Sequence, residues 1–207
     1  MYEALLGRFM DGVHAAGESL NIGALARELN VSQTPLREAL ARLEHTGLVH
    51  REAMKGYRVA PMMTKREISK LMEARLVLEP AMTHEAGLRT TPEFLDELRA
   101  TVEDLARSAD LADTETENFR LYWRSDDRFH VLIAEHCDNP FLESAYRALG
   151  GQIQRFRLFS KLGHTGATFA ATEHRAVYEA LAARDPERAA ELMRVHIREA
   201  QGRNAQY

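Results

Sequence analysis

The sequence has very little cysteine and no long apolar run, and each of these scarcities excludes a class of protein. Cys137 is the only cysteine in 207 residues, so no disulfide can form within one chain, and a disulfide-built secreted domain is excluded. No apolar stretch approaches the roughly 20 residues that a membrane-spanning helix needs. The N-terminus also lacks the basic, apolar and small-residue pattern of a signal peptide. We therefore expect a cytoplasmic protein with no membrane partner.

Net charge is small, but it is unevenly distributed along the chain. The whole sequence carries −4, which argues against a nonspecific coat for nucleic acid. Residues 1–66 hold nine Lys and Arg against seven Asp and Glu, which gives +2. Residues 67–207 hold eighteen against twenty-four, which gives the remaining −6. A mildly basic head on an acidic body is typical of a protein whose head alone contacts phosphates.

Hydrophobic periodicity predicts helices almost throughout, with one short hairpin. In the first part of the chain we expect three helices, at about 2–14, 22–28 and 33–46. Two β-prone segments then predict a two-stranded wing, at 48–50 and 56–60. Capping residues and periodicity place six antiparallel helices after it, at about 64–88, 91–109, 117–137, 139–162, 172–183 and 185–201. Polar or loose loops are expected at 111–116 and 163–171. The predicted fold class is mainly α, with a winged helix-turn-helix domain (1–62) and an antiparallel α-helical bundle (63–207).

The segment 33–43 has the pattern of a helix that reads DNA. Its apolar residues recur at i, i+3, i+4 and i+7 from Leu36 and form one buried stripe. Ser32 is expected to cap its N-terminus. The candidate DNA-contacting residues lie off the stripe and are Gln33, Thr34, Arg37 and Arg42. In the major groove, arginine pairs with guanine edges and glutamine with adenine edges.

The predicted wing supplies the remaining candidate DNA contacts. Lys55 and Arg58 would reach backbone phosphates, and Gly56 lies in the turn between the two strands. The alternative is that all of these residues are the solvated surface of a small helical unit. A wing directly behind a helix-turn-helix favours DNA binding over that alternative.

Four polar residues in the C-terminal half share helix faces with apolar residues. Asp126 and His130 are four residues apart on one helix, on a face that continues with Ile133. His174 and His196 lie on the apolar stripes of two further helices. Burying such groups unpaired is costly, and imidazole and carboxylate ligands suit zinc first, then nickel or another divalent first-row ion. We expect a metal site, and the alternative is a hydrogen-bonded polar network.

Arg75 also lies on a core-facing stripe, in the helix expected at 64–88. An arginine that faces a core needs an anion. Its partner is either an internal carboxylate, such as Glu79 or Asp126, or the carboxylate of a bound metabolite held through two hydrogen bonds. The residues alone leave both open. Arg157 is a second, weaker candidate for the same effector pocket.

Three segments of the head resemble the signature of the GntR family of bacterial regulators. They are residues 31–40 (VSQTPLREAL), 43–44 (LE) and 47–49 (GLV). The turn, the serine at the cap, the arginine and the wing glycine all fall in order. The family often has arginine where this chain has Gln33, so a changed base preference is expected at that step.

The body is similar to the FCD domain, the metal-binding ligand domain of the FadR-like branch of that family. The similar segments are 126–130 (DDRFH), 139–140 (NP), 173–174 (EH) and 193–196 (MRVH). The resemblance implies four metal ligands, which are Asp126, His130, His174 and His196. Asp127 has the wrong spacing to His130 for this role. The resemblance also implies a homodimer, and a small organic acid held by the metal and a helix-one arginine, which favours an effector-binding role for Arg75.

The predicted function is that of a sequence-specific transcription regulator, most simply a repressor, that binds double-stranded operator DNA as a homodimer. Its helical domain would bind a divalent metal ion and a small carboxylate metabolite that alters operator affinity. One alternative is a metal-sensing repressor, in which the ion itself is the signal. Another is a metal-dependent hydrolase, in which three histidines and an aspartate activate water. The sequence has no clear general base, nucleophile motif or phosphate loop, so we expect no enzyme.

Overall fold

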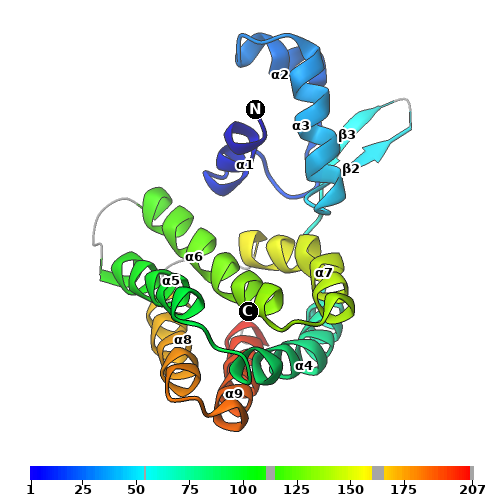
Figure 1. Ribbon diagram of the computed structural model, residues 1–207. Coiled ribbons are helices and arrows are strands. Elements are labelled where there is room, and N and C mark those ends of the chain that lie inside the picture. The colour runs from blue at the N-terminus through cyan, green and yellow to red at the C-terminus, as the bar shows by residue number, and fades with distance from the viewer. Residues whose placement is uncertain (54, 111–114, 160–165, 206–207) are drawn as a thin grey trace. The chain divides into compact units, whose positions relative to one another are not determined.

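The computed structural model describes residues 1–53, 55–110, 115–159 and 166–205. It divides into two compact units, which are described one at a time (Figure 1). The first unit comprises Met1–Thr64 and Gly150–Ser160, and the second comprises Lys65–Leu149 and Lys161–Tyr207. The mainly helical fold class with one small sheet is confirmed. The domain division after residue 62 stays a prediction.

The first unit contains three short helices and a small sheet. The helices are α1 (Tyr2–Met10), α2 (Ile22–Glu28) and α3 (Gln33–His45). Both α1 and α2 pack against α3 (Figure 1). The predicted apolar stripe of α3 is buried, from Leu36 to Leu43, so the opposite face of this helix is left for solvent. The first helix ends before the predicted His14, because Gly12 adopts a left-handed φ of +68° that a helix cannot continue through.

The wing has three strands where two were predicted. The strands are β1 (Ser19–Leu20), β2 (Val49–Glu52) and β3 (Gly56–Val59). They are antiparallel in the order β1-β3-β2, with Leu20 opposite Tyr57 in the register. The prediction missed β1 because two residues are too few to show an alternating pattern.

The second unit is a bundle of six helices, as predicted for the described part of the chain. They are α4 (Lys65–Gly87), α5 (Pro92–Asp110), α6 (Glu115–His136), α7 (Pro140–Phe159), α8 (Gly166–Ala182) and α9 (Pro186–Ala205). The most extensive helix–helix contacts are those between α4 and α9, between α5 and both α6 and α8, and between α8 and α9 (Figure 1). Only the first half of α7 groups with this unit. No helix among the described residues has the length and apolarity to cross a membrane.

Side-chain caps start three of these helices at the predicted positions. The backbone N–H of Phe94 donates to Thr91 Oγ1 at 3.2 Å, that of Leu142 to Asn139 Oδ1 at 3.2 Å, and that of Arg188 to Asp185 Oδ1 at 2.9 Å. Capping acts within three residues, which is why the sequence alone placed these starts.

The start of α8 was predicted six residues too late, at Thr172. The helix already begins at Gly166, so the expectation of a loose stretch is wrong for residues 166–171. Small residues of that first turn are buried, including Ala167 and Ala170. Burial of these small side chains therefore accompanies the earlier start of the helix. The rest of that expected loop (163–165) and residues 111–114 lie outside the described part of the chain.

A close approach of two helices generates a stability prediction at Gly87, the last residue of α4. A Cβ placed there would lie 2.8 Å from Pro186 Cβ and 3.2 Å from Leu181 Cδ2. We expect Gly87→Ala to lower the free energy of unfolding by about 1–3 kcal/mol, because overpacking outweighs the better helix propensity of alanine. Urea unfolding measures this change.

Gly150→Ala is the matched control for this variant. A Cβ at Gly150, inside α7, would meet no atom within 4 Å among the described residues. Alanine should therefore stabilise the protein there by about 0.5–1 kcal/mol. Equal stabilisation by both substitutions would contradict the close packing at Gly87.

Candidate metal centre and nucleic-acid interface

The N-terminal turn of α3 presents a continuous polar surface to solvent. Gln33, Thr34 and Arg37 are exposed, and Arg37 Nη2 donates a hydrogen bond to Gln33 Oε1 at 3.3 Å. Ser32 occupies the predicted N-cap position, but its side chain makes no capping hydrogen bond there. The exposed turn has the residue types that read base edges in a major groove.

Arg42 lies at the other end of the same helix and has a packing partner. Its guanidinium carbon is 4.6 Å from the centroid of the Tyr2 ring. A cation over an aromatic face contributes about 0.5–1 kcal/mol at an exposed site. The structure therefore separates Arg42 from the polar turn and places it against α1, so its predicted contact with DNA stays a prediction.

The two wing residues predicted to contact phosphates lie in different environments. Lys55 is exposed in the turn beside Gly56, whose φ is +96°. Arg58 instead holds the wing together, because Nε donates to Glu52 Oε1 at 2.6 Å and Nη1 donates to the Gly17 carbonyl at 2.6 Å. The hydrogen bond from Arg58 lowers the pKa of Glu52. Of the two predicted phosphate contacts of the wing, Lys55 is thus the one that is exposed to solvent.

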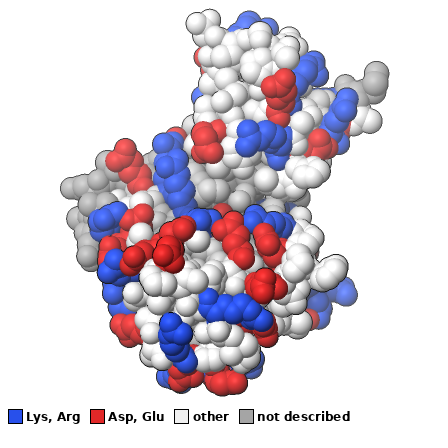
Figure 2. Space-filling model, viewed as in Figure 1, with Lys and Arg blue, Asp and Glu red and all other residues white. Residues whose placement is uncertain are grey.

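Arg51 is a further exposed cation of the head, and the sequence alone did not predict it as a DNA contact. Arg51, on β2, is exposed and lines the same hollow as Arg37 and Gly56. Figure 2 shows basic side chains on the surface around α3 and the wing, with acidic side chains between them. The position of Arg51 on a four-residue strand, five residues before the wing turn closes at Gly56, was the signal that could have identified it.

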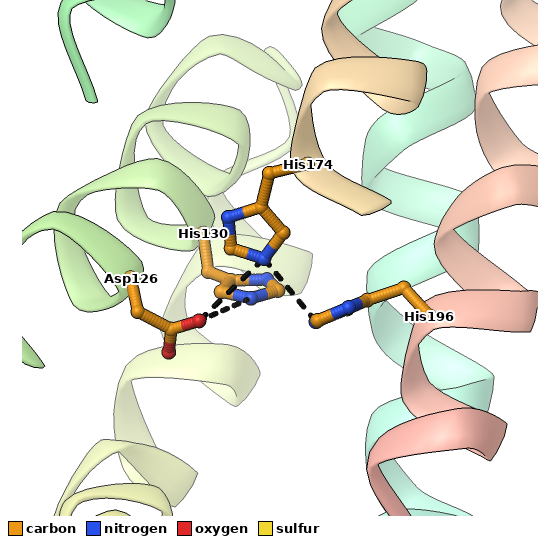
Figure 3. A group of neighbouring side chains, drawn as sticks. All are labelled: Asp126, His130, His174 and His196. Atoms are coloured by element: carbon orange, nitrogen blue, oxygen red, sulfur yellow. Dashed lines mark hydrogen bonds and ion pairs between the residues drawn. The ribbon is translucent and has the colours of Figure 1, made fainter. Parts of the chain in front are cut away.

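The second unit brings the four predicted metal ligands together (Figure 3). Asp126 and His130 come from α6, His174 from α8 and His196 from α9. One ligand atom of each lies within 4.8 Å of the others, and all four residues are buried. Nε2 of His174 lies 3.3 Å from Nε2 of His196 and 3.5 Å from Asp126 Oδ1. Asp127 is only partly buried and is not part of the group.

The chemistry of this donor set fits a divalent metal ion. Three imidazole nitrogens and one carboxylate oxygen are ligands that zinc and its neighbours take. His130 Nε2 is buried, lies 3.9 Å from Asp126 Oδ1, and has no hydrogen-bond partner among the described residues. A buried polar atom left in this way costs about 1–3 kcal/mol. Coordination to a metal would satisfy it.

Two glutamates behind the cluster orient two of the imidazoles. Glu79 Oε2 lies 2.7 Å from His130 Nδ1, and Glu173 Oε2 lies 2.7 Å from His196 Nδ1. A carboxylate at Nδ1 holds the proton on that nitrogen, so the lone pair of Nε2 faces the cluster. This role of the two glutamates could not be predicted from the sequence, because helical spacing does not relate Glu79 to His130 or Glu173 to His196.

Arg75 is buried against an internal carboxylate. Its Nε donates to Glu79 Oε1 at 2.5 Å and its Nη2 to Glu79 Oε2 at 3.2 Å. Of the two partners considered for Arg75, the structure therefore shows the internal one. Burial by itself raises the pKa of Glu79, but the charge of Arg75 and the close contact with His130 Nδ1 outweigh burial and hold that pKa far below its usual range. Burial lowers the pKa of His130, which keeps the imidazole neutral, as a metal ligand must be.

Arg157 is also buried. It belongs to residues 150–160, which group with the first unit. Its predicted contact with an effector stays a prediction.

Both parts of the chain resemble known protein families. Residues 70–199 match the model of the FCD domain, and residues 1–59 match that of bacterial regulatory proteins of the gntR family. The chain is 28% identical over 181 residues to the uncharacterized HTH-type transcriptional regulator YcbG of Bacillus subtilis (strain 168), covering 82% of this chain and 73% of YcbG. It is 26% identical over 153 residues to the gluconate operon transcriptional repressor of Bacillus licheniformis, covering 74% and 60% respectively. The crystal structure of a GntR transcriptional regulator from Rhodococcus sp. RHA1 has the same fold, with a TM-score of 0.77, 21% identity, and coverage of 99% of this chain and 95% of that one.

The buried pair of Arg75 and Glu79 generates a second stability prediction. Glu79→Gln removes the carboxylate that neutralises a buried guanidinium, and breaking such a pair costs about 3–5 kcal/mol. We expect that loss in urea unfolding of the full chain with a chelator present. Glu85→Gln is the control, because Glu85 pairs with Arg89 at the same spacing near the end of the same helix but largely in solvent, where a pair is worth about 0–1 kcal/mol. Similar small losses in both variants would show that the buried pair carries no special weight.

Proposed function

The chain belongs to the gntR family of bacterial regulatory proteins with an FCD domain and is a DNA-binding transcription regulator, and we propose that this domain binds a divalent metal ion and a small organic acid that together set operator affinity. The observation that carries the metal part is the buried group of Asp126, His130, His174 and His196. The relatives named above are regulators and not enzymes, so the hydrolase alternative is set aside.

The ion would be held by the Nε2 atoms of the three histidines and a carboxylate oxygen of Asp126. When bound, it would supply a Lewis-acid centre that accepts the oxygens of an anionic ligand. Zinc suits this set of ligands, and nickel or another first-row ion is the runner-up. His130 and His196 reach the site already oriented by Glu79 and Glu173.

A small organic acid is the effector class that we propose. Its carboxylate is an oxygen donor of the kind that divalent ions take. The relative from Bacillus licheniformis is named for the operon of gluconate, a sugar acid. Because Arg75 is committed to Glu79, we assign the main anchor of the acid to the ion. The predicted contributions of Arg75 and Arg157 to acid binding stay predictions.

Ligand binding would act on DNA through the pairing of two chains. We propose a homodimer whose two heads bind the half-sites of a two-fold operator. The acid shifts operator affinity only if it binds the DNA-bound and free arrangements differently, and DNA then changes the affinity for the acid by the same factor. By analogy with the gluconate operon repressor, we propose that this chain represses and that the acid releases it from DNA.

The metal-sensing alternative gains some support from one contact. Since Arg75 already has an internal anion, the site does not require a metabolite to neutralise it. A pure metal sensor would change its operator affinity at the concentration at which the ion binds, without any acid. In the two-ligand regulator that we propose, the ion alone leaves operator affinity nearly unchanged.

The head generates a prediction about salt and sequence. Binding of the full chain to a random-sequence DNA duplex should weaken linearly on a log–log plot against salt, and Lys55→Ala should reduce that slope by about 1, as expected for one lost phosphate contact. Arg37→Ala should cost about 1–3 kcal/mol on a duplex selected in vitro for tight binding. Fluorescence anisotropy measures both.

Arg58→Ala is not a suitable control for this experiment, because Arg58 ties the wing to Gly17. Arg99→Ala, on the exposed surface of α5 in the second unit, should change neither the slope nor the affinity for the selected duplex. DNA affinity that does not fall with added salt would contradict the assignment of the head.

The metal site generates a prediction about thermal stability. Zinc added to the chelator-stripped chain at about 100 times its Kd should stabilise the folded state by about 2.7 kcal/mol, or raise the unfolding midpoint by about 5–10 °C. His174→Gln should remove the shift, whereas His84→Gln, a partly exposed histidine of α4 outside the cluster, should retain it.

A panel of small carboxylic and sugar acids completes this measurement. One class of acid should add a further increment only when zinc is present. If neither zinc nor any acid moves the midpoint, the four residues form a buried polar network and the metal part of the proposal fails.

A further inference from the structure

Two of the four candidate ligands are each backed by a carboxylate and then by an arginine. On one side the chain of contacts runs from His130 to Glu79 to Arg75. On the other it runs from His196 to Glu173 to Arg203. In both, a carboxylate oxygen lies 2.7 Å from Nδ1 of the imidazole, and the carboxylate is itself held through two guanidinium hydrogen bonds.

The second chain of contacts lies at the edge of the bundle. Arg203 Nη1 donates to Glu173 Oε1 at 2.7 Å, and Nη2 donates to Glu173 Oε2 at 3.0 Å. The side chains of Arg203 and Glu173 are 19% and 18% exposed, against 3% and 1% for Arg75 and Glu79. A substitution of Glu173 or Arg203 therefore leaves no fully buried charge without its partner. Arg203 also lies beyond residues 70–199, the part of the chain that matches the FCD domain.

The surface of α8 holds Arg203 from two sides. Phe169 and Glu173 are four residues apart on this helix and so share a face. The Arg203 guanidinium carbon lies 5.3 Å from the centroid of the Phe169 ring, while its nitrogens bond the Glu173 carboxylate. A planar guanidinium with two hydrogen bonds fixes the plane of its carboxylate. This plane in turn fixes the direction from Glu173 Oε2 to His196 Nδ1.

We propose that Glu173 and Arg203 are positioning residues of the metal centre. Glu173 keeps the proton of His196 on Nδ1 and aims Nε2 at the cluster, and Arg203 keeps Glu173 in the rotamer that does so. The inference rests on the metal site of the proposed function. Loss of such a partner behind a metal-bound histidine typically weakens metal affinity 10–100-fold.

The test measures the affinity of the full chain for zinc by competition with a chromophoric chelator. The variants are Glu173→Gln, which keeps the size and an acceptor oxygen but removes the charge, and Arg203→Ala. We expect zinc affinity to fall about 10–100-fold in each. Because both act through His196, the double variant should lose little more than Glu173→Gln alone. Arg203→Lys, which keeps the charge but not the fork of donors, should lie between the wild type and Arg203→Ala.

Glu191→Gln and Arg194→Ala are the matched controls. Glu191 and Arg194 form an ion pair on the exposed side of α9, on the same helix as His196 but without contact to it. Both should bind zinc as the wild type does. A second readout is the visible absorption of the cobalt-substituted chain, which should change in Glu173→Gln and not in the controls, because it reports the ligands of the metal.

Each outcome decides the inference. Weaker zinc binding in the two variants, with an unchanged thermal midpoint of the metal-free chain, supports it. If the wild type binds zinc and both variants bind within twofold of it, Glu173 and Arg203 only tie α8 to α9; the positioning role is then wrong while the metal site stands. If the wild type binds no zinc, the proposed metal site fails and the inference fails with it. Should Glu173→Gln not fold, Arg203→Ala and Arg203→Lys decide the outcome alone.

Discussion

The second unit depends on the burial of three imidazoles and a carboxylate where a helical bundle normally buries hydrocarbon. Asp126, His130, His174 and His196 come from three helices and are each at most 4% exposed. Their desolvation opposes folding unless every polar atom finds a partner. Two of the imidazoles lie against glutamates, Glu79 and Glu173, and each glutamate accepts hydrogen bonds from an arginine.

That requirement also explains why α4 is more than a packing element. It contributes Glu79 and Arg75 to the cluster from a helix that supplies no candidate ligand. α4 makes its most extensive contacts with α9, which carries His196. A change in the geometry of the cluster is therefore felt by α4, α6, α8 and α9 together, through contacts within one unit. This is the property that a ligand-sensing domain needs.

In the head, basic side chains serve two different purposes. Arg58 and Arg42 hold the head together, one by bridging the wing and the other by packing on Tyr2. Arg37 and Lys55 are exposed to solvent. Because acidic side chains lie between the basic ones on this surface (Figure 2), binding must depend on shape and on base contacts as well as on charge.

Features that act locally in the chain could be predicted from the sequence. Helix starts at Thr91, Asn139 and Asp185 depend on a side chain within three residues. The four clustered residues could be found because each lies on the apolar stripe of its own helix. Their clustering then follows from the assumption that these stripes face one core.

Features that depend on contacts between distant segments could not be predicted. β1 is a strand only because β3 pairs with it. α8 extends back to Gly166 because small residues pack closely there. The partner of Arg75 was left open because an internal carboxylate and a metabolite satisfy a guanidinium equally well. Glu173 was missed because the side chain that gives it a role lies 23 residues away in the sequence.

The near-complete burial of the cluster has a kinetic consequence. The four residues that would hold the ion are 0–4% exposed, so its release requires local opening of the helices that carry them. Its residence time is then governed by the rate of local opening of the bundle, which spans a wide range and is slow for core elements. A metal retained on that timescale would behave as a lasting component of the protein, and the faster exchange needed for a reversible response would fall to the organic acid.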